Sequence, residues 1–338
     1  PPPACPSTHQ EVRTMTLDAE LAAAFDGMPY VGLADPAEAR AAMRDLVSAL
    51  ARPTTAEGAD VADRTIPGPP GAPPVPVRIY RPRGAPHPAP VLVYFHGGGF
   101  VTGGLDNEHD RCLAFAGEDG IAVVSVDYRL APEHPFPAGF DDCYAATVWA
   151  HAHAAEFGGD PRRVAVGGGS AGGALAAAVA LRARDEAGPP LVFQMLLYPV
   201  LDDRMETPSM RAFTEPPLFN RADVGHMWRH YLGGRAAGGA DVPAYAAPAR
   251  AADLAGLPRA YVLVAEYDPL RDEGLGYAHR LIVAGVPTEL HHVPGACHGF
   301  DGIMSARLGR LAFEEQRAVL RRCLSGASPE GWTWPVAK

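Results

Sequence analysis

The chain has 338 residues, of which 47% are hydrophobic, so it is long enough for one large core with a smaller appended domain. Its formal net charge of −10 excludes the basic balance that nucleic-acid binding needs. No apolar run approaches the ~20 residues that span a bilayer, and we expect neither a signal peptide nor a membrane span. The five scattered cysteines form no CxxC pair, which predicts a reducing compartment, the cytoplasm.

Residues 1–60 are expected to form a helical cap segment. Apolar side chains recur at helical spacing in two stretches, with Leu17, Leu21, Phe25 and Met28 in the first and Met43, Leu46 and Leu50 in the second. Asp35, Pro36 and Glu38 supply an N-cap, a proline at the first helical position and a capping-box acid for the second helix. A Pro/Gly-rich linker follows at 66–74.

Beyond the linker, short apolar runs suited to buried parallel strands alternate with helical segments. The predicted strands are Val91–Phe95, Ile121–Val126, Val164–Val166, Val192–Tyr198, Ala260–Ala265 and Glu289–Val293. An edge strand is predicted at 75–79, where apolar residues alternate with polar or proline positions. The predicted helices are Asp110–Gly117, Gly139–Ala155, Gly173–Arg184 and Asp272–Ala284. This order predicts an α/β fold with a mostly parallel, doubly wound sheet.

One stretch interrupts the alternation. From Met205 to Leu232 the chain is richer in Met, Phe, Trp and Arg and has no strand period. We therefore expect a cap insertion at 204–235, which forms a lid with residues 1–60 over the C-terminal edge of the sheet. The core is then split into a first part at 61–203 and a second part at 236–338.

A glycine-rich turn with one serine stands between a predicted strand and a predicted helix. The spacing Gly168-x-Ser170-x-Gly172 fits a nucleophile elbow, in which flanking side chains would collide with neighbouring elements. The same stretch also fits the dinucleotide fingerprint GxGxxG, with Asp202 and Asp203 where a ribose-binding acid could lie. A glycine turn without chemistry is the third interpretation, and this stretch alone does not choose among them.

The loop after the first parallel strand reads His96-Gly97-Gly98-Gly99-Phe100. Acyl transfer passes through an oxyanion, which backbone N–H groups stabilise when they are already aimed at the oxygen. Consecutive glycines let a backbone approach a substrate closely. This loop therefore predicts an oxyanion hole, although a flexible glycine loop would have the same composition.

An acid and a histidine follow later in the chain, each just past a predicted strand. Asp268 follows the strand at 260–265, and His298 follows the strand at 289–293. Carboxyl ends of parallel strands meet at one edge of the sheet, where α/β proteins place their sites. The order serine, acid, histidine matches the elbow interpretation. Glu266 and Asp272 are weaker alternatives for the acid, and we expect Asp272 to cap the next helix.

Five motifs in register resemble the hormone-sensitive lipase family of esterases, also called family IV of the bacterial lipolytic enzymes. They are His96–Phe100, Tyr128–Pro137, the Ser170 elbow, Asp268–Asp272 and His298–Phe300. The resemblance covers roughly residues 75–325.

The resemblance implies an α/β-hydrolase fold with a helical cap, and hydrolysis of carboxylic esters through an acyl-enzyme. Ser170 would be the nucleophile, His298 the general base and acid, and Asp268 the residue that orients His298. The oxyanion donors would be the Ala171 amide with two of the amides of Gly97, Gly98 and Gly99, of which we favour Gly98 and Gly99. The substrate would be a small ester of short or medium acyl chain, no cofactor or metal would be needed, and a homodimer through the last strand is possible.

One position departs from the family. The elbow usually carries an aspartate before the serine, and here Gly169 replaces it. We expect the missing contact to be supplied elsewhere, for example by Glu133. An acyl pocket could be lined by Phe100, Phe213, Phe219 and Trp228, although aromatic residues in a lid more often pack against each other.

Other interpretations carry less weight. His226 and His230 share a helix face but have no third metal ligand, and Cys297 has no base of its own. A nucleotide-dependent oxidoreductase would leave the His96 loop, Asp268 and His298 unexplained. A small-molecule binding protein on the same fold, as in the plant gibberellin receptors that resemble this family, would not need His298. A hydrolase specific for a lactone, an amide or a carbamate would use the same residues.

Overall fold

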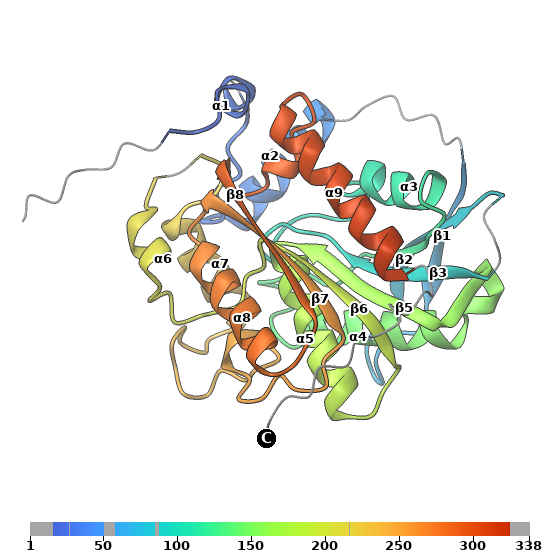
Figure 1. Cartoon of the computed structure of the whole chain (residues 1–338). Coiled ribbons are helices and arrows are strands. Elements are labelled where there is room, and N and C mark those ends of the chain that lie inside the picture. The colour runs from blue at the N-terminus through green and yellow to red at the C-terminus, as the bar shows by residue number, and fades with distance from the viewer. Residues whose placement is uncertain (1–15, 27, 51–57, 85–87, 216, 325–338) are drawn as a thin grey trace, which may run out of the picture.

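The computed structural model describes residues 16–26, 28–50, 58–84, 88–215 and 217–324, and a single eight-stranded sheet runs through them (Figure 1). Its order is β1-β2-β4-β3-β5-β6-β7-β8. The strands are β1 (Ala59–Ile66), β2 (Val75–Pro82), β3 (Ala89–Phe95), β4 (Ala122–Val126), β5 (Gly159–Gly169), β6 (Leu191–Leu197), β7 (Arg259–Tyr267) and β8 (Thr288–Cys297). Strands β3 to β8 are parallel, and β2 is antiparallel to both β1 and β4.

Helices cover both faces of the sheet, which confirms the doubly wound α/β fold (Figure 1). One face carries α3 (His109–Gly117) and α9 (Arg307–Leu324), and the other carries α4 (Ala138–Ala152), α5 (Ala171–Asp185) and α8 (Arg271–Val283). The central strands β3 and β4 are buried on both faces along almost their whole length, so their sequences are predominantly apolar.

The predicted edge strand was wrong in its position. The strand at 75–79 is β2, which has a neighbour on each side, and the edge strand is β1. The strand β1 was missed because it has no apolar alternation: of its eight residues only the first and the last are buried, and charged side chains occupy its middle. Arg78 of β2 pairs with Asp63 of β1, so ion pairs take the place of a hydrophobic face. The sheet therefore begins at Ala59, inside the expected cap segment.

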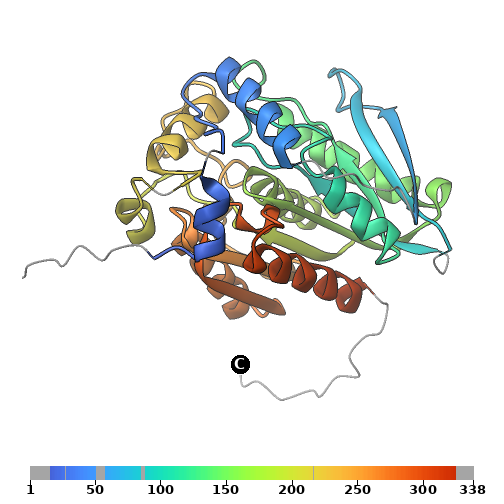
Figure 2. The same cartoon turned by 90° about the horizontal axis from the view of Figure 1, so that it is seen from above.

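The N-terminal helices α1 (Ala19–Phe25) and α2 (Pro36–Leu50) lie on the same side of the molecule as α6 (Pro208–Ala212) and α7 (Arg221–Leu232) (Figure 2). The two segments are joined by hydrogen bonds. The Tyr30 hydroxyl donates to Asp223 of α7 at 2.5 Å, the Leu33 amide donates to the same carboxylate, and His230 donates to the Leu33 carbonyl. These two segments, the roof of the pocket, contribute Met43 and Leu46 from one and Leu218 and Phe219 from the other to its lining.

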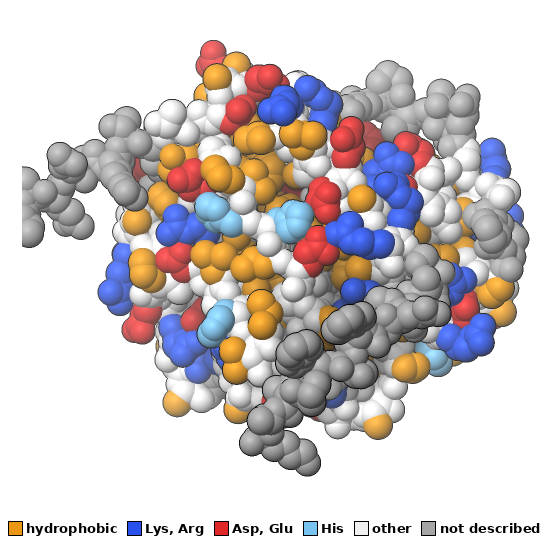
Figure 3. Space-filling view, in the orientation of Figure 1, with side chains coloured by type: hydrophobic (Ala, Val, Ile, Leu, Met, Phe, Trp, Pro, Cys, Tyr) orange, Lys and Arg blue, Asp and Glu red, His pale blue; other side chains and the backbone are white. Residues whose placement is uncertain are grey.

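The surface carries mixed charge. On the face shown in Figure 3, acidic and basic side chains are interspersed rather than gathered by sign. Within the described residues, every helix falls short of the length and hydropathy required to cross a bilayer.

Candidate active site

The topology brings the two glycine-rich loops together. Strands β3 and β5 are neighbours in the sheet although β4 lies between them in the chain, and Phe95 is paired with Gly168. The loop after β3 and the turn after β5 therefore leave the sheet side by side, at the point where the strand order reverses. Such switch points form crevices at the carboxyl ends of the strands.

Ser170 occupies a strained turn between β5 and α5. Its backbone φ is 58° and its ψ is −118°, a combination that residues other than glycine rarely adopt. A Cβ at Gly168 or at Gly172 would collide with the carbonyl oxygen of Phe95. Glycine is therefore required at both flanks, and the strain holds the Ser170 side chain above the sheet at the start of α5.

Ser170, His298 and Asp268 form a continuous hydrogen-bonded chain. The His298 Nε2 lies 2.9 Å from the Ser170 Oγ, and the His298 Nδ1 lies 2.7 Å from the Asp268 Oδ2. The other Asp268 oxygen accepts the Leu270 amide at 2.8 Å, and the Asp268 side chain is fully buried. Ser170 and His298 are 7% and 9% exposed, so solvent and substrate reach them only through the pocket.

Two aromatic rings fix the plane of His298. Phe219 stacks on the imidazole with ring centroids 4.6 Å apart, and Tyr198 meets it edge-on at 4.8 Å. The imidazole is thus held on two sides by rings and at both nitrogens by hydrogen bonds. A histidine held in this way can accept a proton from the serine without changing its position.

The glycine loop lies directly against the elbow. A Cβ on Gly97 would be 3.2 Å from the Gly169 carbonyl oxygen and 3.7 Å from the Ser170 Cβ. Within the described residues, no protein group accepts a hydrogen bond from the amides of Gly98 and Gly99. The Ala171 amide is at the first position of α5, where a helix leaves its N–H groups free.

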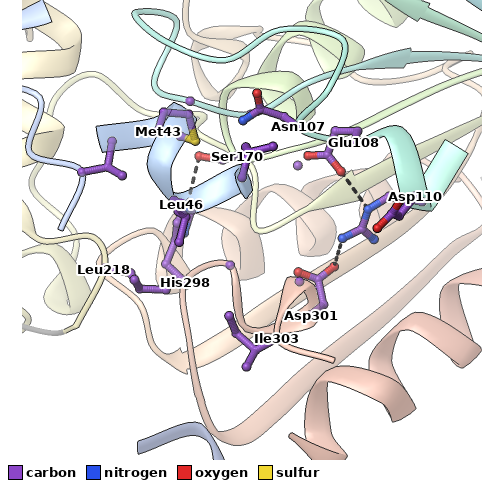
Figure 4. A pocket seen from close by; sticks show the side chains of 18 of the residues that line it. Met43, Leu46, Asn107, Glu108, Asp110, Ser170, Leu218, His298, Asp301 and Ile303 are labelled. Carbon is purple, nitrogen blue, oxygen red and sulfur yellow. Dashed lines mark hydrogen bonds and ion pairs between the residues drawn. The ribbon is translucent and has the colours of Figure 1, made fainter. Parts of the chain in front are cut away.

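A cavity of about 650 Å³ opens above Ser170. Figure 4 shows Met43 and Leu46 of α2 on the same side of the pocket as Leu218 and His298, and Glu108, Asp110 and Asp301 on the opposite side. The pocket is thus largely apolar around the nucleophile, with charged side chains along one wall. Pockets of this size and lining are typical of small-molecule sites.

Comparison with known proteins identifies the family. A model described as the alpha/beta hydrolase fold matches residues 92–302, which contain Ser170, Asp268 and His298. Esterase LipI from Mycobacterium tuberculosis is 44% identical over 294 residues, covering 85% of this chain and 88% of LipI. The chain belongs to the hormone-sensitive lipase family of α/β-hydrolase carboxylesterases.

Two further relatives support this membership. Carboxylesterase NlhH from Mycobacterium tuberculosis is 45% identical, over 71% of this chain and 75% of NlhH. A solved bacterial heroin esterase has a TM-score of 0.89 and 46% identity, over 91% of this chain and 98% of that chain. The resemblance and the fold class inferred from the sequence are thereby confirmed.

The family's usual aspartate before the serine could not be placed here without a shift. A Cβ at Gly169 would lie 3.2 Å from the ring of Tyr198, tighter than ordinary packing. The space beside the elbow is therefore filled by Tyr198, whose hydroxyl donates to Asp301 at 2.6 Å.

Glu133 does not supply the missing contact. It is an exposed residue that accepts two hydrogen bonds from Arg40 of α2, at 2.8 and 2.6 Å. Arg40 also donates to the carbonyls of Val101 and Ala131, so this pair fastens the roof helix to the loops below it. The guanidinium beside Glu133 lowers the pKa of that carboxyl to about 2.

Of the four aromatic residues expected at an acyl pocket, the structure places only Phe219 in the lining. Phe100 is buried and stacks on Tyr231 at 3.7 Å, and Trp228 is buried beside both. Phe213 packs edge-on against Tyr267, outside the pocket. These three side chains fill space between the roof and the core, which apolar rings do in any well-packed cap.

The alternative candidates for a ribose-binding acid, for the acid beside His298 and for metal ligands have other partners in the structure. Asp202 pairs with Arg204 and Asp203 with Arg250, so neither acid is free for a ribose. Asp272 accepts the Ser209 amide instead of capping its own helix, and Glu266 accepts the Gly295 amide. His226 contacts Arg229. In the described residues, the three groups near enough to share a metal ion are Glu289, His291 and Glu315, but Arg322 binds both carboxylates.

Sequence reasoning missed a set of polar residues behind the charged wall. Tyr198, Asp301 and the α3 pair Glu108 and Arg111 come from three separate segments, and only the pair is local. One feature of the sequence could have indicated this set. Asp301 is a charged residue directly after the His298–Phe300 motif, where an apolar residue would pack more easily.

Proposed function

We propose that this carboxylesterase hydrolyses small esters with Ser170 as nucleophile, His298 as general base and acid, and Asp268 as the residue that orients His298. The observation that carries the proposal is the Ser170–His298–Asp268 hydrogen-bonded chain, with distances of 2.9 and 2.7 Å, at the floor of a 650 Å³ cavity. This is the geometry that base-assisted serine attack requires.

The reaction proceeds in two halves. The Ser170 Oγ attacks the ester carbonyl carbon while His298 Nε2 takes the hydroxyl proton, and Asp268 stabilises the imidazolium that forms. The carbonyl oxygen becomes an oxyanion, held by the amides of Gly98, Gly99 and Ala171. His298 then gives its proton to the departing alcohol. Water enters, loses a proton to His298, and attacks the acyl-enzyme, which releases the acid and restores Ser170.

The pocket supports short- to medium-chain acyl groups as substrates. Met43, Leu46 and Val47 of α2 line the cavity together with Ser170, and we expect their side chains to limit the length of chain that fits. We further propose that residues 16–50 and 204–235 act together as the cap. Lactones, amides and carbamates use the same chemistry and form the alternative substrate class.

The test is hydrolysis of p-nitrophenyl esters from acetyl to palmitoyl by the wild type and by Ser170→Ala. Turnover by the wild type that falls at least 10³-fold in the variant supports the proposal, and a second control is thermal unfolding, which should be unchanged in the variant. If a folded wild type turns over no ester in the series, the simple esterase assignment fails. Tight binding of a small acid without turnover would then favour the binding-protein alternative.

We also propose a cellular location and an oligomeric state for this enzyme. We place it in the cytoplasm because Cys112, Cys143, Cys297 and Cys323 are all free. We also propose a homodimer through β8, which is the edge strand at the far end of the sheet and carries the exposed Leu290. Light scattering on the purified protein measures the oligomeric state directly.

A further inference from the structure

The charged wall of the pocket is organised around Arg111 of α3. Its Nε donates to the Glu108 Oε2 at 2.9 Å, and its terminal nitrogens contact the Asp301 Oδ2 at 3.1 Å and the Gln316 side-chain oxygen. The Arg111 side chain is 10% exposed and the Asp301 side chain is fully buried. Figure 4 shows a dashed line at Glu108 and another at Asp301, the two carboxylates that pair with Arg111.

On one side the cluster reaches the oxyanion loop. Glu108 and Gly97 both line the cavity, and the Gly97 backbone lies close enough to the Glu108 carboxylate to affect its pKa. Burial raises the pKa of Glu108, and Arg111 and the Gly97 backbone oppose that rise. Because Gly97 lies against the elbow and precedes Gly98 and Gly99, we expect a displacement of Glu108 to shift the amides of these two glycines.

On the other side the cluster reaches His298. The Tyr198 hydroxyl donates to the Asp301 Oδ1 at 2.6 Å, and Gln316 of α9 donates to the Asp301 Oδ2 at 2.7 Å. The Tyr198 ring meets His298 edge-on, and its own backbone is held by the Leu263 carbonyl at 2.7 Å. Without the Asp301 contact, Tyr198 would lose the bond that fixes its ring against the imidazole.

We propose that Arg111 is a positioning residue for ester hydrolysis, holding the oxyanion loop through Glu108 and His298 through Asp301 and Tyr198. This inference rests on the proposed function. No hydrogen bond joins the guanidinium to Ser170 or His298, so in this proposal it acts by keeping the amide donors and the base in register with each other. Errors of about 1 Å between such groups cost on the order of 100-fold in rate.

Buried ion clusters also contribute to folding, so the test must separate the two effects. Removing one partner of a buried pair leaves an unpaired charge, which destabilises any fold. The chain supplies a matched control in Asp203, which is also fully buried and also paired with an arginine, Arg250, at 2.5 Å. Asp203 is remote from the pocket lining.

The first experiment compares Arg111→Lys, Asp301→Asn and Asp203→Asn with the wild type. For each protein, kcat and KM for one p-nitrophenyl ester are measured below the unfolding temperature, together with the affinity for a trifluoromethyl ketone that mimics the tetrahedral intermediate. We expect kcat to fall at least tenfold in the first two variants with KM nearly unchanged, and the affinity for the ketone to fall in parallel. We expect Asp203→Asn to lower the melting temperature but keep both kinetic values.

Milder variants keep the proposal testable if those two fail to fold. Tyr198→Phe removes one hydroxyl and Glu108→Gln removes one charge, and each should lower kcat in the wild-type background. Because both act through Arg111, their effects should be smaller than additive when combined. The downfield proton resonance of the His298–Asp268 hydrogen bond should also shift in Tyr198→Phe.

Three results would contradict three different parts of this account: the positioning role, the coupling through Arg111 and the proposed function. Wild-type kcat, ketone affinity and proton resonance in folded Tyr198→Phe and Glu108→Gln would overturn the positioning role. Strictly additive effects would overturn the coupling through Arg111. The proposed function itself stands or falls on wild-type turnover and its loss in Ser170→Ala, so the two failures are distinguishable.

Discussion

Phe219 covers the face of His298, with the two ring centroids 4.6 Å apart and the planes inclined by 29°. Phe219 lies just ahead of α7, in the roof, whereas His298 follows the last strand of the sheet. The segment before α7 therefore contributes to the orientation of the His298 imidazole in addition to lining the pocket.

Replacing Phe219 by alanine should lower kcat by roughly tenfold, because the imidazole gains freedom to turn away from Ser170. Phe219→Leu keeps most of the contact and should retain most of the activity. Phe213→Ala is the control, because Phe213 packs on Tyr267 in the same insertion but away from His298. Equal losses in Phe219→Ala and Phe213→Ala would contradict a specific role for the stacked ring.

Neighbouring glycines of the elbow should respond differently to alanine. A Cβ at Gly168 meets backbone atoms of Phe95 and Gly172, which cannot move aside, so Gly168→Ala should abolish activity or folding. A Cβ at Gly169 meets the Tyr198 ring at 3.2 Å, which can shift by a few tenths of an ångström. Gly169→Ala should fold and lower kcat moderately, as thermal unfolding and ester turnover would show. A fully inactive, folded Gly169→Ala would show that Tyr198 has no room to adjust.

The roof helix should set the limit on acyl chain length. Leu46→Trp adds volume above the nucleophile, so the ratio of kcat/KM for octanoyl to acetyl p-nitrophenyl esters should fall by about tenfold or more. Ser48→Trp, two residues along on the exposed side of α2, is the control and should leave the ratio unchanged. An unchanged ratio in Leu46→Trp would place the acyl chain elsewhere in the cavity.

His96 should make the fold sensitive to acid. It is fully buried, and burial lowers the pKa of its imidazole to about 4, against about 6.5 for a free histidine. Between pH 6.5 and about pH 4, the His96 imidazole is therefore protonated in the unfolded state but neutral in the folded state. The stability from neutral His96 is complete above pH 6.5 and is lost as the pH falls toward 4, by up to about 3 kcal/mol.

The measurement for His96 is the free energy of unfolding between pH 4 and pH 8 in the wild type and in His96→Gln. The variant should be less stable at neutral pH, because it loses the stacking on Tyr128 at 4.2 Å, but its stability should change less between pH 6.5 and 4. Parallel curves for the two proteins would assign the acid sensitivity to other groups.

The sequence by itself determined the parallel sheet and the residues at its carboxyl edge. Strands such as Val91–Phe95 are buried on both faces and therefore must be apolar throughout, and the elbow glycines are required by a turn that a side chain would block. Ser170, Asp268 and His298 could be grouped because each directly follows a strand of one sheet. Strand burial and turn geometry act on residues that are close in the sequence, so a short sequence pattern is enough to predict them.

Only the tertiary structure decided which elements support the site. Edge strand β1 carried no apolar pattern, because ion pairs and solvent satisfy its side chains. Phe100 and Trp228 pack in the core, whereas Phe219, an aromatic residue of the same kind, stacks on His298. Their residue type alone does not distinguish these two positions. Tyr198 meets Asp301 across 103 residues of chain, and Arg111 meets Gln316 across 205. Such contacts depend on how distant segments pack in three dimensions, and no spacing within one segment encodes them.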